Sequence, residues 1–522
     1  MRNLFGTWYA LYLVGLLAVL SLARTSDGAV ILLSFGGDAV HLVQIVSRMQ
    51  MDQVPSVDFL TPVGALAFLP FHWLLNSGFS LGGAVAYASV FWAVITLPIT
   101  WWLGQSRLGI WSALAFGTVT LVMWTAYVHG GDGPTVALSM YYNNWGWAIV
   151  SLVALAAFTA PRGDRWLVAV VIGAGIGALA LIKAPFAAYV APAVVVSLAI
   201  ERRWAELLGA FAAGLVLLIV VSVPLGGVAY WQAYIQDLLT VAKSEVRASP
   251  GADLVGMVLE PRHFVLFLGL LAALLFLRQA GRNSQALVFL LLGAGFFAIT
   301  HQNWQNDPHW VLIFGLLLLV EASRVELLNR YGWDLRRALQ FLAAGFLVFA
   351  AQGFVLQAQS LMAHSGLAID GSVALLDDDP TLRVRLAENP AVNVFHPAKD
   401  AADKTVFLGK PLPFCEKDNG LIWDLQASGA ALDALVDTRA KTAFHADWVN
   451  ALWLWSDLDP LPGGAPWYYG GLPGLEAADY LVVPLCPMGR KIRNLALRAV
   501  EESGLSFKEI ARDDRMIVYE KR

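Results

Sequence analysis

The chain has 522 residues, of which 58% are hydrophobic and only 14% are charged, and its formal net charge is −4. Soluble proteins carry roughly a quarter charged residues, so this composition excludes a soluble globular chain and indicates an integral membrane protein. There is no basic excess, so no nucleic-acid partner is expected.

The charged residues are unevenly distributed. Residues 1–358 carry 18 Lys and Arg against 16 Asp and Glu, whereas residues 359–522 carry 17 against 23. We therefore predict a transmembrane domain over 1–358 and a soluble domain over 359–522. The expected fold class is an α-helical polytopic membrane protein of about 11 spans with a C-terminal α/β domain.

A spanning helix needs about 20 apolar residues. The first run follows Arg2 and has no small-residue cleavage site after it, so it is predicted to be a retained span rather than a removed signal peptide. The runs that predict spans lie near 4–23, 81–103, 110–127, 143–160, 166–182, 185–200, 207–227, 263–279, 285–301, 309–323 and 338–358.

The first long polar stretch, residues 35–66, contains Asp38, His41, Asp52 and Asp58. Carboxylates at the edge of a membrane domain are candidates for function. Asp38 follows two glycines and begins a helical pattern, which makes it the strongest candidate. The alternative interpretation is that these acids are solvated loop residues and that Asp38 is a plain N-cap.

Two further segments are predicted to lie along the membrane surface. Residues 63–76 form an apolar run of only fourteen residues that contains Pro70 and His72, which suits an interfacial helix better than a span. Residues 229–249 show apolar residues at helical spacing with charges between them. The alternative for this second segment is a solvated connector helix.

Arginine placement then orients the chain. If 63–76 does not cross, the positive-inside tendency places the N-terminus in the cytoplasm and the C-terminal domain outside. The cytoplasmic arginines would be Arg2, Arg107, Arg162, Arg165, Arg202, Arg203, Arg278, Arg282, Arg324, Arg330, Arg336 and Arg337. The outer loops lack an Asn-x-Ser/Thr acceptor, and we expect a bacterial inner membrane with a periplasmic C-terminal domain.

The C-terminal domain shows mixed patterns. Residues 404–409 and 479–485 predict short buried strands, 492–503 predicts an amphipathic helix, and 507–521 predicts a hairpin. The loop 459–474 is rich in aromatic residues that could stack on a sugar or a lipid, or pack on their own domain. The two cysteines, Cys415 and Cys486, could form a disulfide if this domain faces an oxidising compartment.

The order of several motifs resembles a known family. Asp38 begins a helix after an early outer loop, 58–62 reads Asp-Phe-Leu-Thr-Pro before the interfacial run, Asp132 follows the third span, and 181–183 reads Leu-Ile-Lys at the end of a span. This order is similar to that of the GT-C-fold glycosyltransferases, in the branch of protein O-mannosyltransferases and the lipid A aminoarabinose transferase. The likeness covers roughly residues 1–230.

The resemblance implies transfer of a sugar from a polyprenyl-phosphate carrier to a hydroxyl of a glycan, lipid or protein on the outer face, with inversion. Asp38 would be the general base, with Asp58 or Asp132 orienting the acceptor or sugar. The family often has Asp-Glu at the first position, whereas this chain has Asp38-Ala39. His41, one helical turn on, could fill part of that gap.

Lys183 matches the family lysine that contacts the carrier phosphate, and it is the one lysine in the first 242 residues. A lipid phosphate needs a cation at membrane level, and Pro185 indicates a broken helix there. The alternative is a lysine that extends to the headgroups. Arg247 and Arg262 are further phosphate candidates.

Other polar groups could bind the sugar or the carrier. Tyr142, Asn143 and Asn144 can bind sugar hydroxyls, or can simply begin a helix with interfacial tyrosines. Asn306 and Asp307 lie in an amide-rich stretch between His301 and His309 that could contact the carrier. These two histidines could also bind a metal, but we expect neither a metal nor a cofactor.

Two other functions remain open from the sequence. A transporter or flippase for a lipid-linked sugar would place charges deep inside spans. A non-catalytic membrane scaffold would leave the early acids unexplained, although Ala39 is compatible with it.

Overall fold

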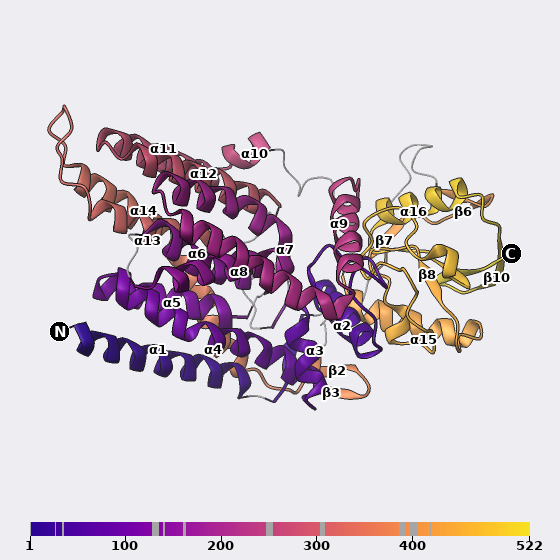
Figure 1. The fold of residues 1–522 in the computed structure, drawn as a ribbon. Helices are drawn as coiled ribbons and strands as arrows, with labels where there is room; N and C mark the ends of the chain where they lie inside the picture. Colours follow the sequence, from indigo (N-terminus) through magenta and orange to yellow (C-terminus); the bar gives the residue numbers. More distant parts are fainter. Residues whose placement is uncertain are drawn as a thin grey trace.

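The structure is a computed structural model of the whole chain. It describes residues 2–26, 28–33, 36–127, 135–138, 141–159, 163–246, 254–302, 308–385, 393–395, 405–417 and 419–522. A bundle of long helices forms one end of the molecule, and a smaller domain with strands gathers at the other end (Figure 1). The expected fold class, a helical polytopic membrane protein with a C-terminal α/β domain, is confirmed.

The bundle is built from apolar helices, most of which are long enough to cross a membrane. They are α1 (Arg2–Thr25), α4 (Leu81–Arg107), α5 (Ile110–Thr125), α6 (Tyr141–Phe158), α7 (Arg165–Ile200), α8 (Trp204–Ser222), α11 (Pro261–Gln279), α12 (Asn283–Gln302), α13 (Trp310–Ala322) and α14 (Leu335–Ser365). Within the described ranges, seven helices are long and apolar enough to cross a membrane, and α5 and α13 are shorter apolar helices.

Helix α7 contains two of the predicted spans, joined at Lys183, where the backbone leaves the helical region with φ −155° and ψ 100°. Helix α8 runs parallel to the first half of α7, because Gly173 faces Ala210 and Gly177 faces Gly214. The beginning of α8 therefore lies beside the beginning of α7. Since α8 starts four residues after α7 ends, α7 must fold back on itself, and Lys183 lies at the tip of a helical hairpin.

The opposite end of the bundle is held by buried arginines. Arg107 donates to Thr159 Oγ1 at 2.9 Å, and Arg203 donates to the Ala157 carbonyl at 3.0 Å. Glu321, only 2% exposed, accepts from Arg282 at 2.7 Å and from Arg324 at 2.6 Å. Charges at this depth are retained only when they are paired or hydrogen-bonded, so these contacts fix the helix ends.

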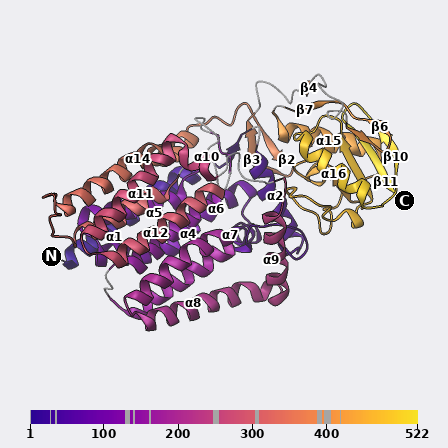
Figure 2. The same cartoon turned by 90° about the horizontal axis from the view of Figure 1, so that it is seen from above.

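Two short helices lie at the other end of the bundle, next to the C-terminal domain. Residues 63–76 form η1 (Ala65–Ala67) and α3 (Leu69–Asn76). Eight helical residues extend only about 12 Å, so α3 is too short to cross a bilayer. Helix α9 (Val228–Ala242) turns away sharply from the direction of α8 (Figure 2). Both placements agree with the predicted interfacial segments.

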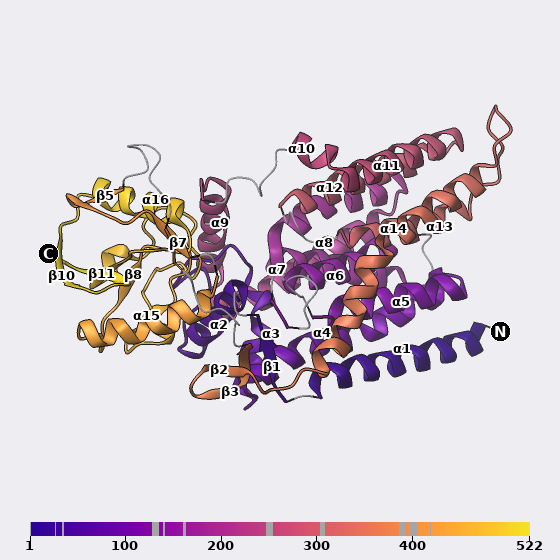
Figure 3. The same ribbon diagram turned by 180° about the vertical axis from the view of Figure 1, so that it is seen from behind.

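A small sheet joins the two parts of the molecule. Strand β1 (Val30–Leu32) pairs in parallel with β3 (Asp379–Arg385), which pairs with β2 (Ser372–Leu376). Figure 3 shows these strands at the junction between the bundle and the C-terminal domain. Helix α14 continues to Ser365, seven residues beyond the predicted domain boundary. A segment assigned to the second domain thus pairs with the first.

The C-terminal domain has a four-stranded sheet in the order β10-β11-β9-β8. Its strands are β8 (Ala443–His445), β9 (Tyr480–Pro484), β10 (Phe507–Arg512) and β11 (Met516–Lys521); the helices are α15 (Leu421–Leu435) and α16 (Arg490–Glu502). Shorter strands are β4 (Asn393–Phe395), β5 (Val406–Phe407), β6 (Lys410–Pro411) and β7 (Cys415–Lys417), and α10 (Leu254–Leu259) precedes α11. The predicted strand, helix and hairpin in 479–521 are all present, and Cys415 and Cys486 form the predicted disulfide.

The close approach of α7 and α8 generates a stability prediction. A Cβ at Gly173 would lie 2.0 Å from the Ala210 carbonyl oxygen, so Gly173→Ala must push the helices apart. Overpacking of this kind costs about 1–3 kcal/mol, and we expect a lower thermal unfolding midpoint in detergent. Gly15→Ala is the matched control, since a Cβ there meets nothing within 4 Å. Equal midpoints for the two variants would contradict this packing.

Candidate functional site

The site is organised around the break in α7. Pro185 has no N–H, so it cannot donate to the Leu181 carbonyl, and in a continuous helix its ring would clash with that carbonyl. The non-helical conformation of Lys183 follows from this constraint. The sequence prediction of a broken or re-oriented helix at Pro185 is confirmed.

Groups from two other segments satisfy the backbone that the break exposes. The Tyr234 hydroxyl donates to the Ala180 carbonyl at 3.2 Å and accepts from the Ala184 N–H, so it replaces a hydrogen bond of the helical ladder. The Gly64 N–H donates to the Ile182 carbonyl at 3.0 Å. A Cβ at Gly64 would lie 2.0 Å from the Leu181 oxygen, so only glycine permits this approach.

The Lys183 side chain is buried and points into the start of α6. Its Nζ donates to Asn143 Oδ1 at 2.9 Å and lies 5.1 Å from the centre of the Tyr142 ring. Beside it, Asn144 is 6% exposed, and its Nδ2 has no hydrogen-bond partner within the described part of the chain. Three of the predicted substrate-binding residues, Tyr142, Asn143 and Lys183, are thus in contact.

Asp38 lies at the start of α2 (Gly37–Gln50) and is half-buried. The N-cap is Gly36, so Asp38 is not a plain cap; it sits in the first turn, where the helix dipole favours a negative charge. The Asp38 carboxylate interacts electrostatically with Tyr141, and the ring of Tyr141 lies 5.3 Å from that of Tyr142. Asp38 thus interacts with one of these neighbouring tyrosines, and Lys183 lies over the other.

A loop of the C-terminal domain covers this end of α2. The Trp467 ring lies 6.1 Å from that of His41, edge to face, and a Cβ on Gly37 would lie 3.3 Å from Trp467. Gln44 donates to the Pro466 carbonyl at 3.2 Å and accepts from Trp453 Nε1 at 3.2 Å. The aromatic loop at 459–474 thus packs on the membrane domain as well as on its own.

The other predicted residues lie apart or outside the described ranges. Asp58 is exposed, and its carboxylate accepts from the Val54 N–H at 2.6 Å, which closes a turn. Arg262 is exposed at the start of α11, with its guanidinium 6.0 Å from the Phe349 ring. The residues outside the described ranges are Asp132, Arg247, Asn306 and Asp307.

Sequence reasoning did not single out Asp237, on α9. Its carboxylate accepts from the Thr61 N–H at 3.0 Å and from the Ser56 hydroxyl. Burial raises the pKa of Asp237 to about 7, and these two hydrogen bonds oppose the shift. The only signal in the sequence was an acid within an amphipathic segment, which does not reveal which face is buried.

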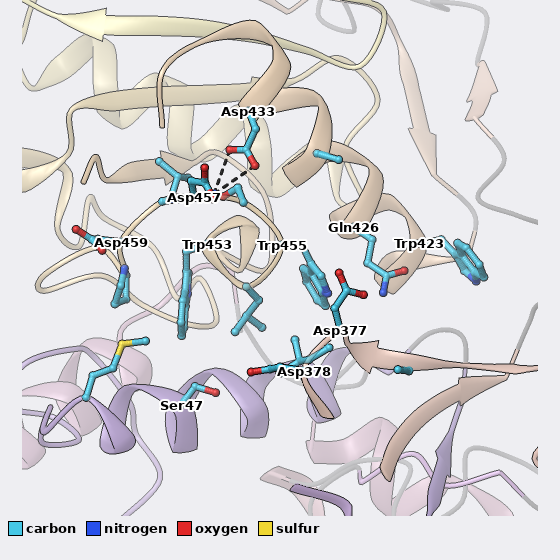
Figure 4. A pocket seen from close by; sticks show the side chains of 18 of the residues that line it. Ser47, Asp377, Asp378, Trp423, Gln426, Asp433, Trp453, Trp455, Asp457 and Asp459 are labelled. Atoms are coloured by element: carbon cyan, nitrogen blue, oxygen red, sulfur yellow. Dashed lines mark hydrogen bonds between the residues drawn. The ribbon is translucent and has the colours of Figure 1, made fainter. Parts of the chain in front are cut away.

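A cleft of about 840 Å³ lies between α2, the β2–β3 hairpin and the C-terminal domain (Figure 4). Its lining includes Trp453, Trp455, Asp377, Asp378 and Asp457, a combination of aromatic rings and acids that suits cationic ligands. The cleft reaches α2 at Ser47, which is about two and a half turns from Asp38 and thus on the opposite face. It is separate from the site at Lys183.

Comparison with known proteins finds no matching family model and no matching curated protein. Two solved structures are similar. ArnT from Cupriavidus metallidurans in the apo state is 12% identical, with 98% of each chain covered and a TM-score of 0.44. ArnT from the same organism bound to undecaprenyl phosphate is also 12% identical with 98% coverage of each chain, and its TM-score is 0.40.

The contact of the 459–474 loop with α2 can be tested by thiol labelling. Because Cys415 and Cys486 are paired, His41→Cys would introduce a single free thiol at a position that is 6% exposed. Adding Trp467→Ala removes an aromatic contact, and we expect maleimide labelling to become about tenfold faster. Trp111→Ala, at an 81% exposed position, is the control. Equal labelling rates with and without Trp467 would show that the loop does not cover α2.

Proposed function

We propose that this protein transfers a sugar from a polyprenyl-phosphate carrier to an acceptor hydroxyl at the membrane surface. The observation that carries the proposal is the buried Lys183 at the tip of a broken hairpin, in contact with Asn143 and Tyr142 at the start of α6. A lysine ammonium at membrane level supplies a point charge for a phosphate. The motif order that resembles GT-C glycosyltransferases supports the same assignment.

In the proposed reaction, Asp38 accepts the proton of the acceptor hydroxyl while the hydroxyl oxygen attacks the anomeric carbon. The bond between that carbon and the phosphate oxygen breaks, and the oxygen keeps the electron pair. Lys183 stabilises the negative charge on the departing phosphate. One displacement inverts the anomeric centre, so no second carboxylate is required as a nucleophile.

The start of α6 supplies polar groups for the sugar. Asn144 Nδ2 is a buried donor that has no hydrogen-bond partner among the described residues, and leaving such a donor unsatisfied costs about 1–3 kcal/mol. We propose that a sugar or phosphate oxygen accepts from it. Asn143 has a positioning role in this proposal, since its side-chain oxygen accepts a hydrogen bond from Lys183.

The remaining predicted residues keep secondary roles in this proposal. Asp132 would orient the acceptor or the sugar, while Arg247, Asn306 and Asp307 would contact the carrier. Asp58 supports the loop that leads to Gly64 rather than the reacting atoms, because its carboxylate closes a turn.

The proposed orientation places the C-terminal domain and the site on the outer side of a bacterial inner membrane. The disulfide between Cys415 and Cys486 supports this orientation, since disulfides persist in oxidising compartments. The arginines at the far end of the bundle, among them Arg107, Arg203 and Arg282, are then cytoplasmic, in agreement with the positive-inside tendency.

The test is sugar transfer by purified protein in lipid, supplied with a panel of radiolabelled polyprenyl-phosphate sugars. Asp38→Asn should lower turnover about 10²–10⁴-fold with carrier binding retained, because only the base is lost. Lys183→Met should weaken carrier binding by about tenfold or more, since the phosphate loses a charge-assisted contact.

Two variants serve as matched controls. Asp52→Asn changes an exposed acid in the same segment, and Lys243→Met changes an exposed lysine at the end of α9. Both should behave like the wild type. Unchanged turnover in Asp38→Asn would exclude Asp38 as the base, and the absence of transfer from every carrier by the wild type would contradict the proposed function.

A further inference from the structure

Helix α9 presents three buried polar side chains on one face. Tyr230, Tyr234 and Asp237 are spaced by four and three residues, and none is more than 7% exposed. Ile235 and Leu239 on the same helix are 52% and 47% exposed. The polar face of α9 is therefore the face that packs against the rest of the protein. The hydrogen-bond partners of these three side chains hold the helix in place.

Each of the three polar groups contacts a different part of the framework around Lys183. Tyr234 bridges Ala180 and Ala184 within the break of α7. The Tyr230 hydroxyl accepts from the Ala65 N–H at 3.1 Å, and Asp237 accepts from the Thr61 N–H at 3.0 Å. The Tyr234 contact is made with α7 itself. The contacts of Tyr230 and Asp237 are made with residues on either side of Gly64.

Gly64 completes the connection. Its N–H donates to the Ile182 carbonyl, one residue before Lys183. If the 56–65 segment moved, the Ile182 carbonyl at the α7 break would lose its hydrogen bond from Gly64.

We propose that α9 is a latch, in which Asp237 and Tyr234 are positioning residues that hold the α7 break in the conformation that presents Lys183 to the carrier phosphate. This inference rests on the proposed function of Lys183. It adds a control of carrier binding by groups that contact neither the sugar nor the phosphate.

The strength of the latch should depend on pH through the charge state of Asp237. An ionised carboxylate accepts hydrogen bonds about twice as strong as a neutral acceptor does. With the pKa of Asp237 raised to about 7 by burial, the ionised form dominates above that pH and the protonated form below it. The latch should hold best above pH 7 and loosen as the pH falls through that value.

In the described part of the chain, the groups that face Asp237 come from the 56–61 loop and from α9. The loop presents Ser56 and the Thr61 N–H, and α9 itself presents Tyr230 and Tyr234, which are the titratable neighbours. Both tyrosines stay neutral across the pH range 6 to 8, because tyrosine ionises only near pH 10 or above. A change in that range is therefore assigned to Asp237.

The experiment measures binding of undecaprenyl phosphate to the full-length protein in nanodiscs between pH 6 and pH 8. The second ionisation of a phosphate monoester lies near pH 6 and affects every variant equally. On falling from pH 8 to pH 6, the wild type should lose about fivefold more affinity than Asp237→Asn, which keeps an acceptor for Thr61 but cannot titrate.

Tyr234→Phe is the second variant. It removes the hydroxyl from the break while keeping the ring, and we expect carrier binding about tenfold weaker at pH 8. Gln236→Leu is the matched control, because Gln236 is exposed on the same helix. It should bind the carrier as the wild type does at both pH values.

The outcomes separate the latch from the proposed function. If the wild type binds no polyprenyl phosphate at any pH, the proposed function fails. If the wild type binds it, but Asp237→Asn keeps the wild-type pH profile and Tyr234→Phe keeps the wild-type affinity, the latch is overturned and the role of Lys183 stands.

Discussion

A helix that breaks inside a membrane protein must satisfy the backbone groups that the break exposes, because lipid offers no hydrogen bonds. In this chain Pro185 imposes the break, and Lys183 takes the non-helical conformation. Tyr234 and Gly64 supply the missing partners. The interfacial helix α9 and the loop before α3 are thus required for α7 to fold as it does, and the position of the lysine depends on both.

The same constraint explains how a lysine can be buried at this position. Its ammonium donates a hydrogen bond to the Asn143 side-chain oxygen and lies near the face of the Tyr142 ring. A cation stabilised in this way can still be attracted by an incoming phosphate. Asp38, in the first turn of α2, interacts electrostatically with Tyr141, which is the neighbour of Tyr142 in α6.

Much of this arrangement could be predicted from local patterns. Composition and apolar runs indicated the bundle. Pro185, two residues after Lys183, indicated the break in the helix. The short run at 63–76 indicated an interfacial helix. The contacts of Asp237 and Tyr234 could not be predicted, because they join α9 to segments more than 50 residues earlier and a hydropathy pattern does not specify such partners. The parallel pairing of β1 with β3 joins strands some 350 residues apart and was missed for the same reason.

The most direct test of this account is an experimental structure of the protein in lipid with undecaprenyl phosphate bound. We expect the phosphate within about 3 Å of Lys183 Nζ, the usual range for a charge-assisted hydrogen bond. We also expect that Asn144 Nδ2 and the first turn of α2 face the same cavity. A phosphate bound elsewhere, with no contact to Lys183, would contradict the central role of the α7 break.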